Sequence, residues 1–184
     1  MSKILVVNGS PRKNGVDAAI ISEISKRLTP KGHEVEVLDI CDMDIHGCIA
    51  CMSCKSTGKC FRNDDMAGIY DKIRASDMLI FTTPIYFGAE SGQLKTFIDR
   101  LYALTEQEKP LGNVRISSTL VVCGDPLGHL KYTPTVSRMT SVFKYLGVDD
   151  FASGYVIGGL EPKDVPGDER VSQYIDGLEF QLGM

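Results

Sequence analysis

The stretch Met78-Leu79-Ile80-Phe81-Thr82-Thr83-Pro84-Ile85-Tyr86-Phe87-Gly88 decides the fold. Its first six residues form the most apolar strand pattern of the chain, which predicts a central strand buried on both faces. The five residues that follow end this strand as a loop. A central parallel strand needs helices on each side, so helices should alternate with strands in the rest of the sequence.

Strand and helix patterns do alternate on both sides of this segment. Strands are predicted at 3–8, 34–40, 78–83, 116–122 and 151–157, and helices at 17–29, from 64–65 onward, at 91–104, 135–146 and 168–182. This pattern predicts an α/β fold with a doubly wound, five-stranded parallel sheet and right-handed crossovers. The flavodoxin-like order 2-1-3-4-5 fits best. Ligands of such sheets bind at the C-terminal ends of the strands, where strands 1 and 3 diverge.

Length and composition exclude several classes of protein. The chain has 184 residues, 43% of them hydrophobic, which predicts a single domain over 1–184 with a cysteine-rich loop insertion at about 41–63. A net charge of −4 without a basic run argues against nucleic-acid binding. No apolar run reaches the roughly 18 residues of a membrane span, and the N-terminus is a poor signal peptide. We therefore expect a cytoplasmic protein with no membrane partner.

The loop Gly9-Ser10-Pro11-Arg12-Lys13-Asn14-Gly15 follows the first predicted strand. A serine hydroxyl, an arginine guanidinium and the N–H groups of a helix start are suited to binding a phosphate. The loop has neither the G-K-[ST] of a Walker A motif nor a G-x-G-x-x-G pattern, so it indicates neither ATP nor a dinucleotide fold. The alternative is a plain surface turn.

The loop 84–88 follows the central strand at the same edge of the sheet. Tyr86 and Phe87 beside Gly88 could flank a flat ring, with backbone groups reaching its polar rim. The alternative is ordinary loop packing.

Four of the six cysteines fall within thirteen residues, at Cys48, Cys51, Cys54 and Cys60. This C-x2-C-x2-C-x5-C spacing suits an iron–sulfur cluster, and the C-x2-C-x2-C part is shared with ferredoxin-type sequences. Structural zinc, a redox disulfide and thiols that bind nothing remain alternatives. In a cytoplasmic protein thiols stay reduced, which favours a metal or redox site over a disulfide framework.

Four motifs together carry a resemblance to a known family: the Gly-Ser-Pro-Arg loop, Asp64-Asp65-Met66, the run 83–88, and 94–100 (Leu-Lys-Thr-Phe-Ile-Asp-Arg). In this order they resemble the NADPH-dependent FMN reductase family. The cysteine run between them is similar to the iron–sulfur flavoprotein branch of that family. The resemblance covers roughly residues 1–125.

The resemblance implies two cofactors, FMN and a [4Fe–4S] cluster that can be lost in air. The implied cluster ligands are Cys48, Cys51, Cys54 and Cys60. The implied FMN-binding residues are Ser10, Arg12, Asn14, Val16, Pro84, Ile85, Tyr86, Phe87, Gly88 and Gly124. A homodimer or homotetramer, in which a cluster faces a neighbour's flavin, is implied as well.

One position departs from the family pattern. Val16-Asp17 stands where the family usually has Asn-Thr or a similar polar pair. A carboxylate there would repel a phosphate dianion by about 1 kcal/mol or more at short range. Alternatively, Asp17 points away as an N-cap.

The function expected from the sequence is FMN-dependent electron transfer between a reduced donor, ferredoxin or NAD(P)H, and an acceptor, through FMN and the cluster. No catalytic acid, base or nucleophile is assigned. One alternative is a cluster-free NAD(P)H-dependent FMN or quinone reductase. The other is a non-catalytic electron carrier or metal-binding module.

Overall fold

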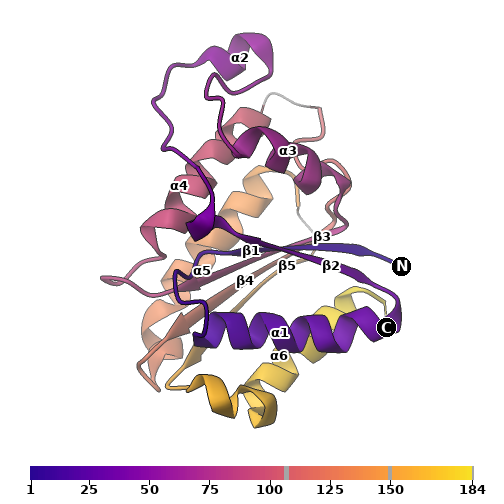
Figure 1. Ribbon diagram of the computed structural model, residues 1–184, viewed down its shortest axis with the longest axis vertical. Helices are drawn as coiled ribbons and strands as arrows, with labels where there is room; N and C mark the ends of the chain where they lie inside the picture. The colour runs from indigo at the N-terminus through magenta and orange to yellow at the C-terminus, as the bar shows by residue number, and fades with distance from the viewer. Residues whose placement is uncertain (106–107, 149–150, 184) are drawn as a thin grey trace.

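The computed structural model describes residues 1–105, 108–148 and 151–183, and a five-stranded sheet forms its centre (Figure 1). All neighbouring strands are parallel, and their order β2-β1-β3-β4-β5 confirms the predicted fold class. The strands are β1 (Lys3–Asn8), β2 (Glu34–Asp39), β3 (Met78–Pro84), β4 (Ile116–Cys123) and β5 (Phe151–Gly158).

Helices cover both faces of the sheet. The α-helices are α1 (Val16–Leu28), α2 (Ser53–Thr57), α3 (Met66–Ala75), α4 (Gly92–Arg100), α5 (Gly128–Tyr145) and α6 (Glu169–Gln181). The 3-10 turns are η1 (Thr29–Lys31), η2 (Ile40–Asp42), η3 (Leu101–Leu104) and η4 (Pro162–Gly167). Figure 1 shows α1 and α6 on one face and α3, α4 and α5 on the other, with α2 outermost above α3.

The core consists of two apolar layers separated by the sheet. Because side chains alternate along a strand, Ile4 and Val6 of β1 pack under α1 and α6, while Leu5 and Val7 pack under α3, α4 and α5. In the second layer, the Phe81 ring of β3 lies with its centroid 4.5 Å from that of Phe143 in α5. Because both faces of the central strands are buried, a ligand can reach these strands at their ends.

The central strand predicted from the sequence is central in the structure. β3 lies between β1 and β4, and its residues 78–83 are buried. The edge position predicted for β2 is also confirmed.

Two segments differ from the predicted secondary structure. α5 begins at Gly128 rather than Thr135 and continues through Pro134. Asp125 starts the helix early, because its side chain accepts the Leu127 N–H at 2.9 Å and its carbonyl accepts the Gly128 N–H at 2.9 Å. The cysteine segment, expected to have little regular structure, contains η2 and the short helix α2.

Among the described residues, no helix combines the length and the apolar character that crossing a bilayer requires.

Candidate functional site

The loop after β1 is fixed by contacts that only glycine permits at its start. The Gly9 N–H donates to the carbonyl of Thr82 on β3 at 2.9 Å. A Cβ at Gly9 would lie 2.8 Å from the Cβ of Leu94 on α4, closer than side chains pack. The buried Ser91 hydroxyl donates to the Gly9 carbonyl at 2.7 Å and accepts the Leu94 N–H at 3.2 Å. The loop is therefore held against both β3 and the first turn of α4.

The rest of this loop is shaped by its own hydrogen bonds. The Ser10 N–H donates to the side chain of Asn8 at 3.0 Å, and Asn8 in turn donates to Asp39 on β2 at 2.8 Å. The Gly15 N–H donates to the Arg12 carbonyl at 3.0 Å. Gly15 is the N-cap of α1 and has no side chain to cap the helix. The first turn of α1 therefore faces the loop as an anion-binding terminus.

A cavity of about 620 Å³, the switch-point pocket, lies where β1, β3, β4 and β5 end. Its volume is in the range of small-molecule and cofactor sites. Three sequence-distant loops line it, those after β1, β3 and β4, together with the segment after β5. Its lining residues are Ser10, Arg12, Asn14, Gly15, Val16, Asp17, Pro84, Ile85, Tyr86, Val122, Cys123, Gly124, Leu160, Glu161 and Pro162. The structure thus brings together eight of the ten predicted cofactor-binding residues.

The other two, Phe87 and Gly88, are not in the wall of this pocket. Tyr86 and Ala89 exchange two backbone hydrogen bonds, at 2.9 and 3.2 Å, and close a tight turn. Both central residues of the turn have positive φ, +49° at Phe87 and +84° at Gly88. The turn directs the Phe87 ring into solvent, where its side chain is fully exposed.

Asp17 lies in the wall of the switch-point pocket and is only 3% exposed. The expectation that it points away as the N-cap was wrong, because Gly15 occupies that position. Its Oδ1 is buried and has no hydrogen-bond partner among the described residues. Burial raises the pKa of the Asp17 carboxyl to about 6, although its own N–H and the Ser10 hydroxyl act in the opposite direction.

The cysteine loop forms a second cavity, the cysteine pocket, of about 230 Å³. All four predicted ligands, Cys48, Cys51, Cys54 and Cys60, line it. The first two are exposed and the last two half-buried. Ala50 and Met52 both have positive φ, +53° and +61°. Such conformations cost non-glycine residues about 1–2 kcal/mol each and are often found at ligand sites.

An ion pair buried beneath this loop holds it to α4. Arg100 donates to both carboxylate oxygens of Asp64, at 2.5 and 2.9 Å, and to the His46 carbonyl at 2.7 Å. Both charged side chains are 1% exposed. Burial alone would raise the pKa of Asp64, but the Arg100 hydrogen bonds reverse the direction and lower it. Asp99, the neighbour of Arg100 on α4, pairs with Lys95 instead.

Arg100 also forms part of the wall of the cysteine pocket. Its Nε is buried and has no hydrogen-bond partner among the described residues. The guanidinium, which is paired with Asp64, is therefore part of the wall that the four cysteines share.

In the described part of the chain, no three His, Cys, Asp or Glu side chains converge as a preassembled site for a metal ion. The four cysteines nevertheless line one cavity. A single tetrahedral ion needs all its sulfurs about 2.3 Å from one point, whereas a four-iron cluster takes one cysteine at each iron. Four cysteines lining one cavity match the number of ligands that either group takes.

The switch-point pocket and the cysteine pocket share no lining residue. α4 connects them: Ser91, its N-cap, holds the loop after β1, and Arg100, its last residue, holds the cysteine loop. Nine helical residues span about 14 Å. The cysteine loop leaves the sheet at the predicted edge, but its tip lies over α3 and the end of α4 (Figure 1).

Sequence reasoning missed Leu160, Glu161 and Pro162, which line the switch-point pocket after β5. Topology could have found them, because β5 ends at the same edge as β1 and β3. It also missed the pairing of Asp64 with Arg100, which lie 36 positions apart without any local signal.

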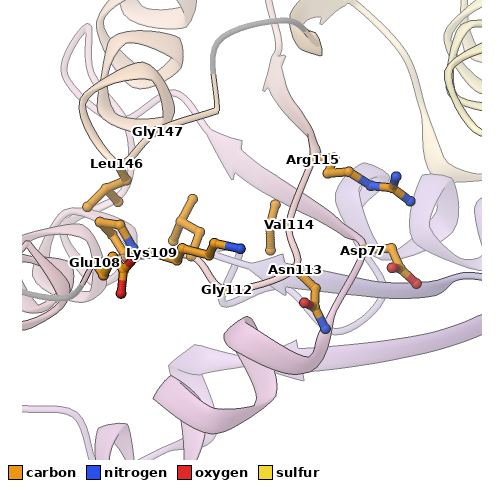
Figure 2. Close-up of a pocket in the computed structure, with 11 residues that line it drawn as sticks. Asp77, Glu108, Lys109, Gly112, Asn113, Val114, Arg115, Leu146 and Gly147 are labelled. Atoms are coloured by element: carbon orange, nitrogen blue, oxygen red, sulfur yellow. The ribbon is translucent and has the colours of Figure 1, made fainter.

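A further cavity, of about 530 Å³, lies at the opposite edge of the sheet (Figure 2). It is lined by 108–115, Asp77, Leu146 and Gly147. The Asp77 carbonyl accepts the N–H groups of Arg115 and Ile116, at 3.0 and 3.4 Å, and thereby sets the start of β4. This cavity lies at the N-terminal ends of the strands, and Asp77 has a structural role there. The cavity is therefore a weaker candidate than the switch-point pocket.

Comparison with known proteins gives one family match along most of the chain. The family model described as NADPH-dependent FMN reductase matches residues 2–151. An iron–sulfur flavoprotein of Archaeoglobus fulgidus is 32% identical over 172 residues, which cover 93% of this chain and 74% of that protein. An iron–sulfur flavoprotein of Methanocaldococcus jannaschii is 36% identical over 98 residues, or 53% of this chain. The match spans about half of that relative, 51% of its length.

Among solved structures, an NAD(P)H:quinone oxidoreductase from Methanothermobacter marburgensis superposes with a TM-score of 0.70. The superposition covers 95% of this chain and 90% of that one at 19% sequence identity. At this identity the likeness shows a shared fold.

Proposed function

This chain belongs to the NADPH-dependent FMN reductase family, in its iron–sulfur flavoprotein branch, and from that premise we propose that it is a flavin-dependent oxidoreductase that binds FMN in the switch-point pocket. The observation that carries the proposal is the convergence of three loops and the α1 terminus on one cavity of cofactor size.

The residues present fit the two ends of FMN. At one end, Ser10, Arg12 and Asn14 with the N-terminus of α1 would hold the phosphate. At the other, Pro84 to Tyr86 and Gly124 would lie along the ribityl chain and ring. When bound, FMN supplies the exchange between two-electron and one-electron transfer. The side chains contribute binding, orientation and the exclusion of water.

We also propose that Cys48, Cys51, Cys54 and Cys60 hold a [4Fe–4S] cluster. Two observations support this: four cysteines line one cavity, and the first part of their spacing is shared with ferredoxin-type sequences. The names of the two iron–sulfur flavoproteins support it as well.

Electron exchange between the two cofactors is proposed to involve a second copy of the chain. Within one chain, α4 separates the two pockets by its own length, about 14 Å. A homodimer or homotetramer that places the cysteine pocket of one subunit against the switch-point pocket of another would shorten this path. The fully exposed Phe87, on the turn beside the switch-point pocket, is the kind of side chain that such a contact covers. NAD(P)H or ferredoxin would be the donor, in the cytoplasm.

A cluster-free NAD(P)H-dependent reductase is the second candidate. It is supported by the family model described as NADPH-dependent FMN reductase, which matches residues 2–151. In that case the cysteine loop would serve as a structural cover over α3 and α4.

Anaerobic purification of the full chain distinguishes these proposals. The first predicts bound FMN together with about four irons per chain. FMN without iron, combined with NADPH oxidation, would support the second. Metal without flavin would point to a metal-binding module, and protein that takes up neither cofactor from an anaerobic reconstitution mixture would overturn both proposals.

A further inference from the structure

The switch-point pocket contains a negative charge at the end where an anion is expected. Asp17 belongs to the first turn of α1, whose N–H groups attract anions. Its side chain is 97% buried, and its Oδ1 has no hydrogen-bond partner among the described residues. It lines the same wall as Ser10, Arg12 and Asn14. A phosphate bound by these groups would therefore lie beside a carboxyl group.

Few positive charges face this carboxyl. Arg12 is the cationic side chain in the wall of the pocket. The neighbouring Lys13 is paired with Asp42 at 2.9 Å.

The other titratable groups around Asp17 are a cysteine, several carboxyl groups and one exposed lysine. Cys41 on η2 is close enough for Asp17 to contribute to the rise of its pKa, after burial and two nearer aspartates. Glu161 lines the pocket after β5, and Asp39 on β2 accepts a hydrogen bond from Asn8. η4 packs against α1 and carries the exposed Lys163 and Asp164.

Asp17 cannot stay ionised beside a phosphate dianion without strong repulsion, because burial removes the water that would screen the two charges. One proton held between the two groups removes this repulsion. It can sit on the carboxyl, or on a phosphate oxygen that donates to Oδ1. Both arrangements give Oδ1 the partner that it lacks.

We propose that Asp17 couples the binding of the phosphate end of FMN to the uptake of one proton, which the carboxyl and the phosphate then share. This rests on the proposed function, since it takes FMN as the ligand of the switch-point pocket. Asp17 is accordingly a specificity-determining residue, which favours a phosphate that brings or receives a proton over a bare dianion.

The direction in which FMN affinity changes with pH follows from the pKa values of Asp17 and of the phosphate before binding. The free Asp17 carboxyl has a pKa of about 6, and the second pKa of a phosphate ester is also about 6. Above pH 6 both are increasingly deprotonated before binding, so the shared proton must come from solvent. With both pKa values near 6, FMN affinity then falls by about threefold from pH 6 to 7 and by about eightfold from pH 7 to 8.

The test is a fluorescence titration of the full chain, freed of flavin, with FMN and with riboflavin at pH 6, 7 and 8. Riboflavin lacks the phosphate, so its affinity should change less than about threefold over this range. Wild-type affinity for FMN should fall by about 25-fold. Asp17→Asn and Asp17→Thr should bind FMN with little pH dependence, and more tightly than wild type at pH 8. The control Asp164→Asn removes an exposed carboxylate of η4 and should keep the wild-type slope.

Calorimetry in two buffers of different ionisation enthalpy counts the protons that are taken up when FMN binds. FMN binding at pH 8 should take up about one proton in wild type and almost none in Asp17→Asn. A wild-type FMN affinity that is constant from pH 6 to 8, or a pH slope in the Asp17 variants as steep as that of wild type, would overturn the inference while riboflavin binding upholds the pocket. Failure of wild type to bind either flavin would overturn the proposed function, and this inference with it.

Discussion

The switch-point pocket and the cysteine pocket are held in place in different ways. The first is formed by short connections from neighbouring strands, and hydrogen bonds such as Gly9 to Thr82 fix its loop directly to the sheet. The second is formed by a long loop that one buried ion pair anchors to α4. Two residues of this loop, Ala50 and Met52, have a left-handed backbone conformation. A site at a sheet edge follows from the fold, whereas a site on a long loop depends on a few side chains.

The two pockets should differ most clearly when one predicted iron ligand is removed. Cys51→Ala should abolish iron binding, because the exposed Cys51 contributes a thiol to the cysteine pocket but little packing. FMN binding should persist, and the free energy of unfolding without metal should change by less than about 0.5 kcal/mol. Iron analysis and urea unfolding measure these effects. Cys41→Ala, outside the cysteine pocket, is the matched control and should retain iron; if it loses iron as well, the ligand assignment is wrong.

The anchor of the cysteine loop should be the largest single contribution to stability that the two pockets contain. Arg100→Met leaves Asp64 buried without its partner, so the free energy of unfolding should fall by about 3–5 kcal/mol. Urea unfolding measures the loss. On the same helix, Lys95→Met breaks the exposed pair with Asp99 and should cost less than about 0.5 kcal/mol. Equal losses for the two variants would mean that the buried pair is not the anchor.

The loop of the switch-point pocket should be sensitive to a single methyl group. Gly9→Ala places a Cβ 2.8 Å from Leu94 and 3.0 Å from the Thr82 carbonyl, which should cost about 1–3 kcal/mol and weaken FMN binding. Thermal or urea unfolding and flavin titration report the two effects. Gly68→Ala, in α3 with open space around it, should instead stabilise the protein by up to about 1 kcal/mol. A loss at Gly68 as large as at Gly9 would argue against steric contact as the cause.

The smallest effect is expected at the turn beside the switch-point pocket. Phe87→Gly relieves a positive φ and removes no buried packing, so the free energy of unfolding should rise by less than about 1 kcal/mol. Urea unfolding at low protein concentration measures it. A clear loss of stability would show that the Phe87 ring is packed in solution, as it would be at a subunit contact.

The sequence predicts the switch-point pocket better than the cysteine pocket for a physical reason. Apolar runs such as Leu79-Ile80-Phe81 determine the strand order, and the strand order gathers Ser10, Tyr86 and Gly124 at one edge. The outward orientation of Phe87 depends on the positive φ angles of its turn, which the residue types do not predict.

The other differences between the predicted and the observed structure also arise from features that no local sequence pattern specifies. No local pattern signals that Asp64 will pair with Arg100, or that Asp17 will be buried instead of capping α1. The spacing of the cysteines indicated a shared site, but not that its tip would lie over the helical layer. Long-range contacts between side chains decide these outcomes.

α4 links the two loops through its two ends, and this sets a constraint on how the protein can evolve. Each residue added to an α-helix turns everything beyond it by about 100° and moves it by about 1.5 Å. A one-residue insertion in α4 would swing Arg100 away from Asp64 while leaving Ser91 in its place on Gly9. The exposed positions of this helix can therefore change freely in sequence among descendants of the chain, but its length cannot.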